Sequence, residues 1–95
     1  MSVILHSKPK CPQCTATDRA FTKKSIERDY RDASTDETSL NRVRELGYTQ
    51  VPVVELTDGL ALPDGTTHWY GYRPDYIGQL ATVLAEQAES VSAAA

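Results

Sequence analysis

Cys11-Pro12-Gln13-Cys14 contains both cysteines of this 95-residue sequence and closely follows an apolar run, Val3-Ile4-Leu5. Two thiols at this spacing can close a disulfide or share a metal ion. A disulfide between them encloses only four residues. The loop-entropy relation predicts that a disulfide closing such a loop stabilises the fold by about 2 kcal/mol, against about 4.7 kcal/mol for a 100-residue loop. The pair is therefore a weak structural link, and a redox role suits it better.

A metal site is the main alternative for the two thiols. Structural zinc takes about four ligands, and neither histidine, His6 or His68, stands at a finger-like spacing from the cysteines. We therefore expect no metal. A small metal-binding or scaffold domain that uses the cysteines structurally stays as a hypothesis from a different functional class.

Length and charge limit the remaining classes. The chain is long enough for one hydrophobic core, so we treat 1–95 as a single domain and expect 86–95 to be a helix end and a frayed tail. A net charge of −3 argues against a general nucleic-acid binder. The sequence has no apolar run of the roughly 18 residues that span a membrane and no secretory signal pattern. We expect a cytoplasmic monomer with no nucleic-acid or membrane partner.

The apolar periodicity and the turn signals predict alternating strands and helices. In chain order they predict a central strand at 3–6, a helix at 12–24, an edge strand at 26–32, a helix at 36–46, a strand at 51–56, a returning strand at 66–70 and a helix from 74. A right-handed crossover makes the first two strands parallel, and the last two form a hairpin. The fold class is therefore α/β, in the order β-α-β-α-β-β-α, with a four-stranded mixed sheet and three helices.

The predicted position of the thiols assigns them unequal roles. Only a thiolate attacks a disulfide, and Cys11 stands at the start of a predicted helix, where free N–H groups and the helix dipole favour negative charge. Lys8 and Lys10 add positive charge nearby. Cys14 lies three residues further on, on the same side of the helix. We expect it to be more buried and to act as the resolving thiol.

Three stretches resemble the glutaredoxin branch of the thioredoxin superfamily, and within it the NrdH redoxins, which are electron donors to class Ib ribonucleotide reductase. They are Ser7-Lys8-Pro9-Lys10-Cys11-Pro12-Gln13-Cys14-Thr15-Ala16-Thr17, then Leu46-Gly47-Tyr48 leading to Val51-Pro52-Val53-Val54, and His68-Trp69-Tyr70-Gly71-Tyr72-Arg73-Pro74-Asp75. The last is similar to the signature Trp-Ser-Gly-Phe-Arg-Pro-Asp of that family. The resemblance covers residues 3–84 and implies the thioredoxin fold, with strand order 2-1-3-4.

The resemblance also implies an activity and partners. Cys11 is expected to be the nucleophile and Cys14 the resolving thiol of a thiol-disulfide oxidoreductase without a bound cofactor. NADPH and FAD act through the partner, thioredoxin reductase, and electrons pass to the large subunit of class Ib ribonucleotide reductase. A glutathione-dependent glutaredoxin is the alternative within the same fold.

The family pattern assigns further residues to partner binding. Pro52 is expected to be a cis-proline beside the dithiol, with the backbone of Val51 pairing with an extended target segment. Tyr72 replaces a glycine of glutaredoxins and is expected to obstruct glutathione. The full set of expected binding residues is Lys8, Pro12, Gln13, Val51, Pro52, Trp69, Gly71, Tyr72 and Arg73. The chain departs from the family at Tyr70 and Tyr72, and in a longer hairpin at 57–66 that adds Leu60-Ala61-Leu62.

Overall fold

The computed structural model describes residues 2–94, with side chains described as far as residue 87. Its elements, in chain order, are β1 (Val3–Ser7), α1 (Pro12–Lys23), β2 (Asp29–Asp32), α2 (Glu37–Glu45), β3 (Val53–Leu56), β4 (His68–Tyr70) and α3 (Pro74–Ala94). This order confirms the predicted succession of strands and helices.

The four strands form one mixed sheet in the order β2-β1-β3-β4. β1 is parallel to β2 and antiparallel to β3, and β3 is antiparallel to β4. The predicted strand order 2-1-3-4 is therefore confirmed. β1 is central, as its unbroken apolar run predicted, whereas the charged strand β2 lies at an edge.

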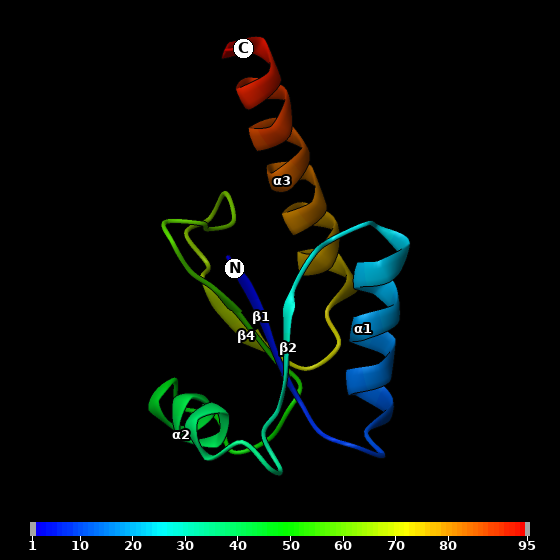
Figure 1. Ribbon diagram of the computed structural model, residues 1–95, viewed down its shortest axis with the longest axis vertical. Helices are drawn as coiled ribbons and strands as arrows, with labels where there is room; N and C mark the ends of the chain where they lie inside the picture. Colours follow the sequence, from blue (N-terminus) through cyan, green and yellow to red (C-terminus); the bar gives the residue numbers. More distant parts are fainter. Residues whose placement is uncertain (1, 95) are drawn as a thin grey trace.

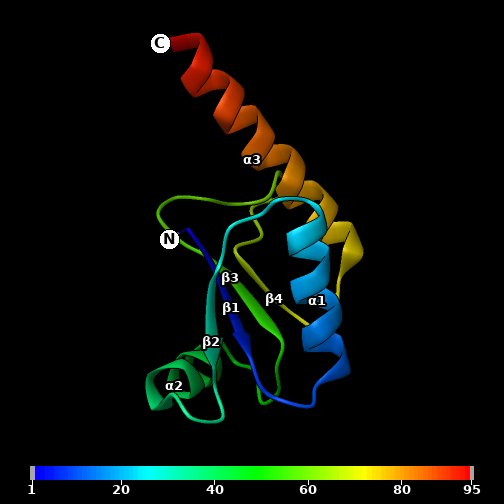
Figure 2. The ribbon, with the colours of Figure 1, turned by 45° about the vertical axis from the view of Figure 1, so that its right-hand side comes forward.

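The helices cover the two faces of the sheet unequally (Figures 1 and 2). α1 and the first part of α3 lie together on one face, and α2 lies on the other. The face under α1 and α3 carries the hydrophobic core, which includes Leu5, Phe21, Val54, Ile77 and Leu80, each completely buried. Alternate residues of a strand point to opposite faces. Leu5 and Val54 therefore enter this core, whereas their neighbours face α2.

The long connection between β3 and β4 completes the core. Leu60 and Leu62, to which the sequence assigned no role, are 4% and 3% exposed and belong to the core cluster. Backbone hydrogen bonds from Leu60 N–H to the Thr57 carbonyl and from Leu62 N–H to the Thr66 carbonyl hold the connection in place. The extra length of this segment therefore contributes apolar area to the fold.

Helix α3 includes most of the segment 86–95, for which the sequence predicted a helix end and a frayed tail. It continues to Ala94, and its far half extends away from the sheet (Figure 1). Alanine and glutamate, which have high helix propensity, are frequent in this part of the chain. The part of the expected tail at Ala95 lies outside the described residues.

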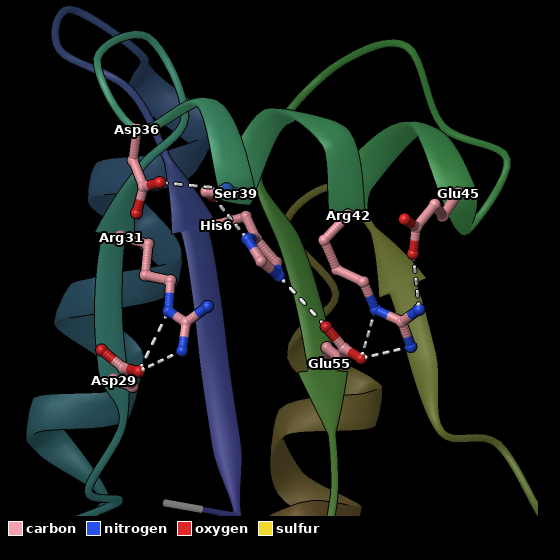
Figure 3. A network of polar contacts seen from close by, with 8 residues as sticks. All are labelled: His6, Asp29, Arg31, Asp36, Ser39, Arg42, Glu45 and Glu55. Atoms are coloured by element: carbon pink, nitrogen blue, oxygen red, sulfur yellow. Dashed lines mark hydrogen bonds and ion pairs between the residues drawn. The ribbon is translucent and has the colours of Figure 1, made fainter.

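The face under α2 contains a polar network instead of a purely apolar core (Figure 3). His6 of β1 contacts Ser39 Oγ of α2 through Nδ1 at 2.6 Å and Glu55 Oε1 of β3 through Nε2 at 3.2 Å. Arg42 of α2 pairs with the second oxygen of Glu55 at 2.7 Å and with Glu45 at 3.1 Å. His6 and Ser39 are fully buried and Glu55 is 5% exposed. The network therefore joins β1, β3 and α2 through polar contacts that solvent hardly reaches.

Glu55 is the centre of this network. Burial raises the pKa of Glu55, but the hydrogen bonds from Arg42 and His6 outweigh burial and hold it below its ordinary value. A group with a lowered pKa in the folded state stabilises the fold at pH values above its unfolded pKa. That contribution is lost as the pH falls through the folded value. The ion pair of Glu55 should therefore weaken only in acid, below about pH 4.3.

We expect Glu55→Gln to lower the free energy of unfolding at neutral pH by about 2 kcal/mol. This is less than the cost of breaking a fully buried pair, because Arg42 is partly exposed. Urea unfolding at pH 7 and at decreasing pH measures the change, and the gap between wild type and variant should narrow in acid. Glu45→Gln is the matched control, since it removes a surface partner of the same arginine and should cost less than about 1 kcal/mol. Equal losses in the two variants would contradict a central role for Glu55.

Candidate active site

Cys11 and Cys14 form a disulfide at the N-terminus of α1. Cys11 is the N-cap residue, and its Sγ accepts the backbone N–H of Cys14 at 3.2 Å. Pro12 occupies the first turn, where its missing N–H leaves no helical hydrogen bond unmade. Cys11 is 7% exposed and Cys14 is 2% exposed. The positions at the helix start and the deeper burial of Cys14 agree with the sequence prediction.

The segment between β1 and α1 turns sharply before the first cysteine. Lys10 has a φ of 55°, in the left-handed region that residues with a side chain seldom adopt. Lys8 and Lys10 are exposed, whereas Ser7 at the end of β1 is buried and its carbonyl accepts the Ala33 N–H at 2.8 Å. The turn therefore begins from a fixed strand end and presents both lysines to solvent beside the dithiol.

A second segment, 40 residues away in sequence, lies against the disulfide. The Val51–Pro52 peptide bond is cis, as the family resemblance implied. The carbonyl oxygen of Val51 is 3.9 Å from Cys11 Sγ. This juxtaposition follows from the sheet, because His6 near the end of β1 lies opposite Val53 at the start of β3.

Gly71 and Tyr72 close the site from a third segment. The Gly71 N–H donates to the Pro52 carbonyl at 2.8 Å, and the Tyr72 N–H donates to Gln13 Oε1 at 3.1 Å. Gly71 has a φ of 88°, and a Cβ there would stand 3.2 Å from the same Gln13 oxygen. Only glycine adopts this positive φ without strain and leaves room for the Gln13 oxygen. Gln13, expected to bind a partner, thus also fixes the position of Tyr72.

Of the two residues Trp69 and Arg73, which were expected to line a docking surface, the structure buries Trp69 and leaves Arg73 exposed. Trp69 is 3% exposed and belongs to the core. Its ring lies 5.1 Å from that of Tyr76, and this contact connects β4 with α3. The burial of Trp69 contradicts a place on the docking surface. The pleat explains this, because Trp69 lies opposite Val54 and faces the core with it. Arg73 is exposed, pairs with Asp75 at 2.9 Å and stacks over Tyr76.

A hollow of about 250 Å³ lies on the α2 side of the dithiol. Lys8 and Val51 line it together with residues that the sequence did not single out, among them Leu40, Val43 and Gln50. Leu40 and Val43 stand three residues apart in α2, a spacing that is typical of ordinary core positions of a helix. No local signal marks them as pocket residues, since the hollow forms only where α2 meets the segment before β3.

Two further features of the described residues bear on other functions. Among the side chains of residues 2–87, no three from histidine, cysteine, aspartate or glutamate gather where they could hold a metal ion. No helix in that same part of the chain is both long and apolar enough to span a bilayer.

Comparison with known proteins places these features in a family. The glutaredoxin family model matches residues 3–60. The glutaredoxin-like protein NrdH of Salmonella typhimurium is 30% identical over 80 residues, which are 84% of this chain and 89% of that protein. The chain belongs to the glutaredoxin family, in its NrdH group. It is accordingly a thiol-disulfide redox protein, with Cys11 and Cys14 forming its Cys-x-x-Cys pair.

Solved structures of glutaredoxin-like proteins share the fold. The NrdH-redoxin of Escherichia coli, a glutaredoxin-like protein described as having a thioredoxin-like activity profile, superposes with a TM-score of 0.70 at 28% identity. The match covers 84% of this chain and 95% of that one. A glutaredoxin from Archaeoglobus fulgidus superposes with a TM-score of 0.63 at 20% identity, covering 84% of this chain and 86% of its own, and supports the fold alone.

In this NrdH-type protein, we expect Gly71→Ala to destabilise the fold more than Gly65→Ala. Both glycines have a positive φ, but a Cβ at Gly65 meets nothing within 4 Å. Gly65→Ala should therefore cost only the backbone term of about 1 kcal/mol, whereas Gly71→Ala also pushes on Gln13. Urea unfolding of the two variants measures the difference.

A double variant tests the cause of that difference. In a Gln13→Ala background, which already lacks the hydrogen bond to the Tyr72 N–H, Gly71→Ala should cost only the backbone term, because the Gln13 oxygen is then absent. If the two glycine variants were equally stable, the close approach at Gly71 would have no energetic weight.

Proposed function

We propose that this protein donates electrons to a class Ib ribonucleotide reductase and is itself reduced by an NADPH-driven thioredoxin reductase. The observation that carries the proposal is the Cys11–Cys14 disulfide at the start of α1, flanked by the cis Val51–Pro52 bond and by Tyr72. The similarity to NrdH proteins supports the choice of partners.

The first chemical step is attack by the reduced Cys11 thiolate on a sulfur of the target disulfide. The Cys11–target bond forms as the target S–S bond breaks, and the departing target sulfur takes up a proton. Cys11 suits this role because it is the less buried thiol. The N–H that its sulfur accepts from Cys14, together with the helix N-terminus, favours negative charge there.

The second step resolves the mixed disulfide. Cys14 loses its proton and attacks Cys11 Sγ, which forms the Cys11–Cys14 bond and releases the second target sulfur as a thiol. Two electrons have then moved from the protein to the target, which also gains two protons: one comes from Cys14, and the other is taken from solvent in place of the proton that Cys11 released on ionising. The reductase returns the two electrons from NADPH through its own FAD and dithiol, so the protein itself needs no bound cofactor.

We propose that the target chain docks in extended form against Val51. The Val51 carbonyl lies next to Cys11 Sγ, so a strand paired with Val51 brings its own cysteine to the attacking sulfur. The hollow lined by Lys8, Leu40 and Val51 is the adjacent space for a target side chain.

Tyr72 distinguishes this proposal from a glutathione-dependent glutaredoxin. The residue is 40% exposed and its backbone is held by Gln13, so its ring stands where glutaredoxins keep a glycine for glutathione. We infer that this ring denies glutathione a tight fit and leaves protein partners as the substrates.

A coupled assay tests the choice of reductant. We expect rapid NADPH oxidation with thioredoxin reductase, this protein and an oxidised class Ib ribonucleotide reductase, and a rate at least about tenfold lower with glutathione and glutathione reductase. Such a difference corresponds to about 1.4 kcal/mol. Tyr72→Gly should raise the glutathione-coupled rate, because the space is opened. Turnover of the wild type with glutathione alone would overturn the proposal and favour a glutathione-dependent glutaredoxin.

Single cysteine variants test the assigned roles. Cys14→Ser should trap the protein in a mixed disulfide with the large subunit of ribonucleotide reductase, visible as a band that thiol reductants remove. Cys11→Ser should form no such band and should lose disulfide reduction while keeping its fold. Normal turnover by Cys14→Ser would rule out a two-thiol mechanism.

A further inference from the structure

A groove of about 310 Å³ runs between helix α1 and Tyr72, and we refer to it as the α1 groove. It is lined by Ala16, Arg19, Ala20, Lys23 and Tyr72. The four helical residues recur at intervals of three and four, so they form one stripe on a single face of α1. From Ala16 to Lys23 the stripe is about 10 Å long, at 1.5 Å per residue. Three residues of an extended peptide cover that length.

The α1 groove carries two positive charges without an acidic partner. Arg19 and Lys23 are exposed, and neither enters an ion pair within the described part of the chain. Elsewhere in the described residues, Arg28, Arg31, Arg42 and Arg73 each pair with a carboxylate, and Arg44 of α2 does not. Arg19 and Lys23 also stand four residues apart on one helix, where like charges destabilise by about 0.2–0.5 kcal/mol. Lys23 lies in the last turn of α1, where the helix dipole favours a cation, so the helix accounts for Lys23 but not for Arg19 beside it.

Positive and negative residues are also unevenly distributed along the whole chain, with the excess of positive charge in the part that contains α1. Residues 1–26 contain five lysine or arginine residues and a single acid, Asp18. That acid is engaged by Arg28 at 2.6 Å. Residues 27–95 contain five arginines and twelve acids. In a chain with a net charge of −3, the segment that contains α1, the helix that begins at the dithiol, thus has an excess of positive charge, and the rest has an excess of negative charge.

The wall of the α1 groove is attached to the active site. Gln13 lies between the two cysteines, and its side chain accepts the Tyr72 N–H. Tyr72 is 40% exposed and, with Tyr30, is one of the two large apolar side chains that the described chain leaves open to solvent. A ligand in this groove therefore meets an aromatic wall, a floor of two alanines and two cations, immediately beside the Cys-x-x-Cys motif.

We propose that the α1 groove docks an acidic, extended segment of the protein whose disulfide this protein reduces. The inference rests on the proposed function, since it assumes that Cys11 and Cys14 act on a protein disulfide. Arg19 and Lys23 attract the carboxylates, and Tyr72 packs on the apolar parts of the segment. Attraction of this kind acts mainly on association and weakens as salt shortens the screening length.

Three short peptides test the proposal. Each carries one cysteine as a mixed disulfide with 2-thiopyridine, an uncharged leaving group whose release is followed by absorbance. The cysteine is flanked by glutamates, by glutamines or by lysines. We expect the reduced wild-type protein to react with the glutamate peptide about fivefold faster than with the glutamine peptide at low ionic strength, and slowest with the lysine peptide. The preference should shrink at high salt.

Variants locate the effect on the molecule. Arg19→Gln with Lys23→Gln should remove most of the preference for the glutamate peptide and leave the rate with the glutamine peptide unchanged. Arg44→Gln is the matched control, since Arg44 is an exposed arginine of α2 with no ion pair in the described residues. Amide NMR shifts of the oxidised wild type, titrated with the glutamate peptide carrying serine for cysteine, should change along the Ala16–Lys23 stripe and at Tyr72.

The outcomes separate this inference from the proposed function. Equal rates with the three peptides, a loss in Arg44→Gln as large as in the double variant, or shift changes outside the α1 groove would overturn the docking site while disulfide reduction persists. Salt-sensitive dimers of the wild type that the double variant does not form would assign the groove to a second copy and also overturn it. Failure to reduce any peptide would instead count against the proposed function itself.

Discussion

The antiparallel register of β1 and β3 is the constraint on which the site depends. His6 opposite Val53 brings the end of β1 beside the start of β3, so the Cys11 turn and the Val51–Pro52 bond meet although 40 residues separate Cys11 from Val51 in the chain. A shift of one residue would send the alternate side chains of β3 to the wrong faces of the sheet. The same register that buries Val54 in the core therefore also sets the distance between Cys11 Sγ and the Val51 carbonyl.

The two faces of the sheet secure this register in different ways. Under α1 and α3 the contacts are apolar and tolerate small shifts, because dispersion and burial are not directional. Under α2 the register depends on hydrogen bonds with defined geometry, since Glu55 must meet both His6 and Arg42 (Figure 3). A buried polar network of this kind contributes less to stability than an equal apolar volume, but a slipped strand would leave its members unpaired. The network therefore favours one arrangement of β1, β3 and α2.

Local patterns were enough to predict most of the fold. The apolar run Val3-Ile4-Leu5, the stripe around Ile77 and the turn at Gly47 are short-range signals, and the elements that they predict are present. Gly47, with a φ of 94°, follows α2, and its N–H and that of Tyr48 satisfy carbonyls of the last helical turn. The limits of α3 were less predictable, because helix propensity changes gradually along its alanine-rich end.

The site was predictable only where it is local. Cys11, Pro12 and Cys14 could be placed from their spacing, and the cis bond at Pro52 followed from resemblance. The contacts that complete the site are long-range, as between Gln13 and Tyr72. The burial of Trp69 was missed for a similar reason, since an aromatic residue beside a surface motif can face either side of a short strand. The sequence also did not indicate that Arg42 pairs with Glu55. The residues around a charged side chain in an apolar strand do not indicate which helix supplies the opposite charge.

The separation of charge bears on how a two-cysteine site can be selective. Thiol-disulfide exchange needs the same two sulfurs for every target, so discrimination has to come from the surface around them. Cations on α1 draw an acidic partner toward the dithiol, and the acids of residues 27–95 repel it elsewhere. These charges orient an approaching partner before contact. In return, one face of α1 carries two like charges four residues apart, which slightly destabilises the helix. The proposed exclusion of glutathione by the Tyr72 ring would add a steric criterion beside the same dithiol. Chemistry and selection thus reside in different residues, joined by the Gln13 side chain.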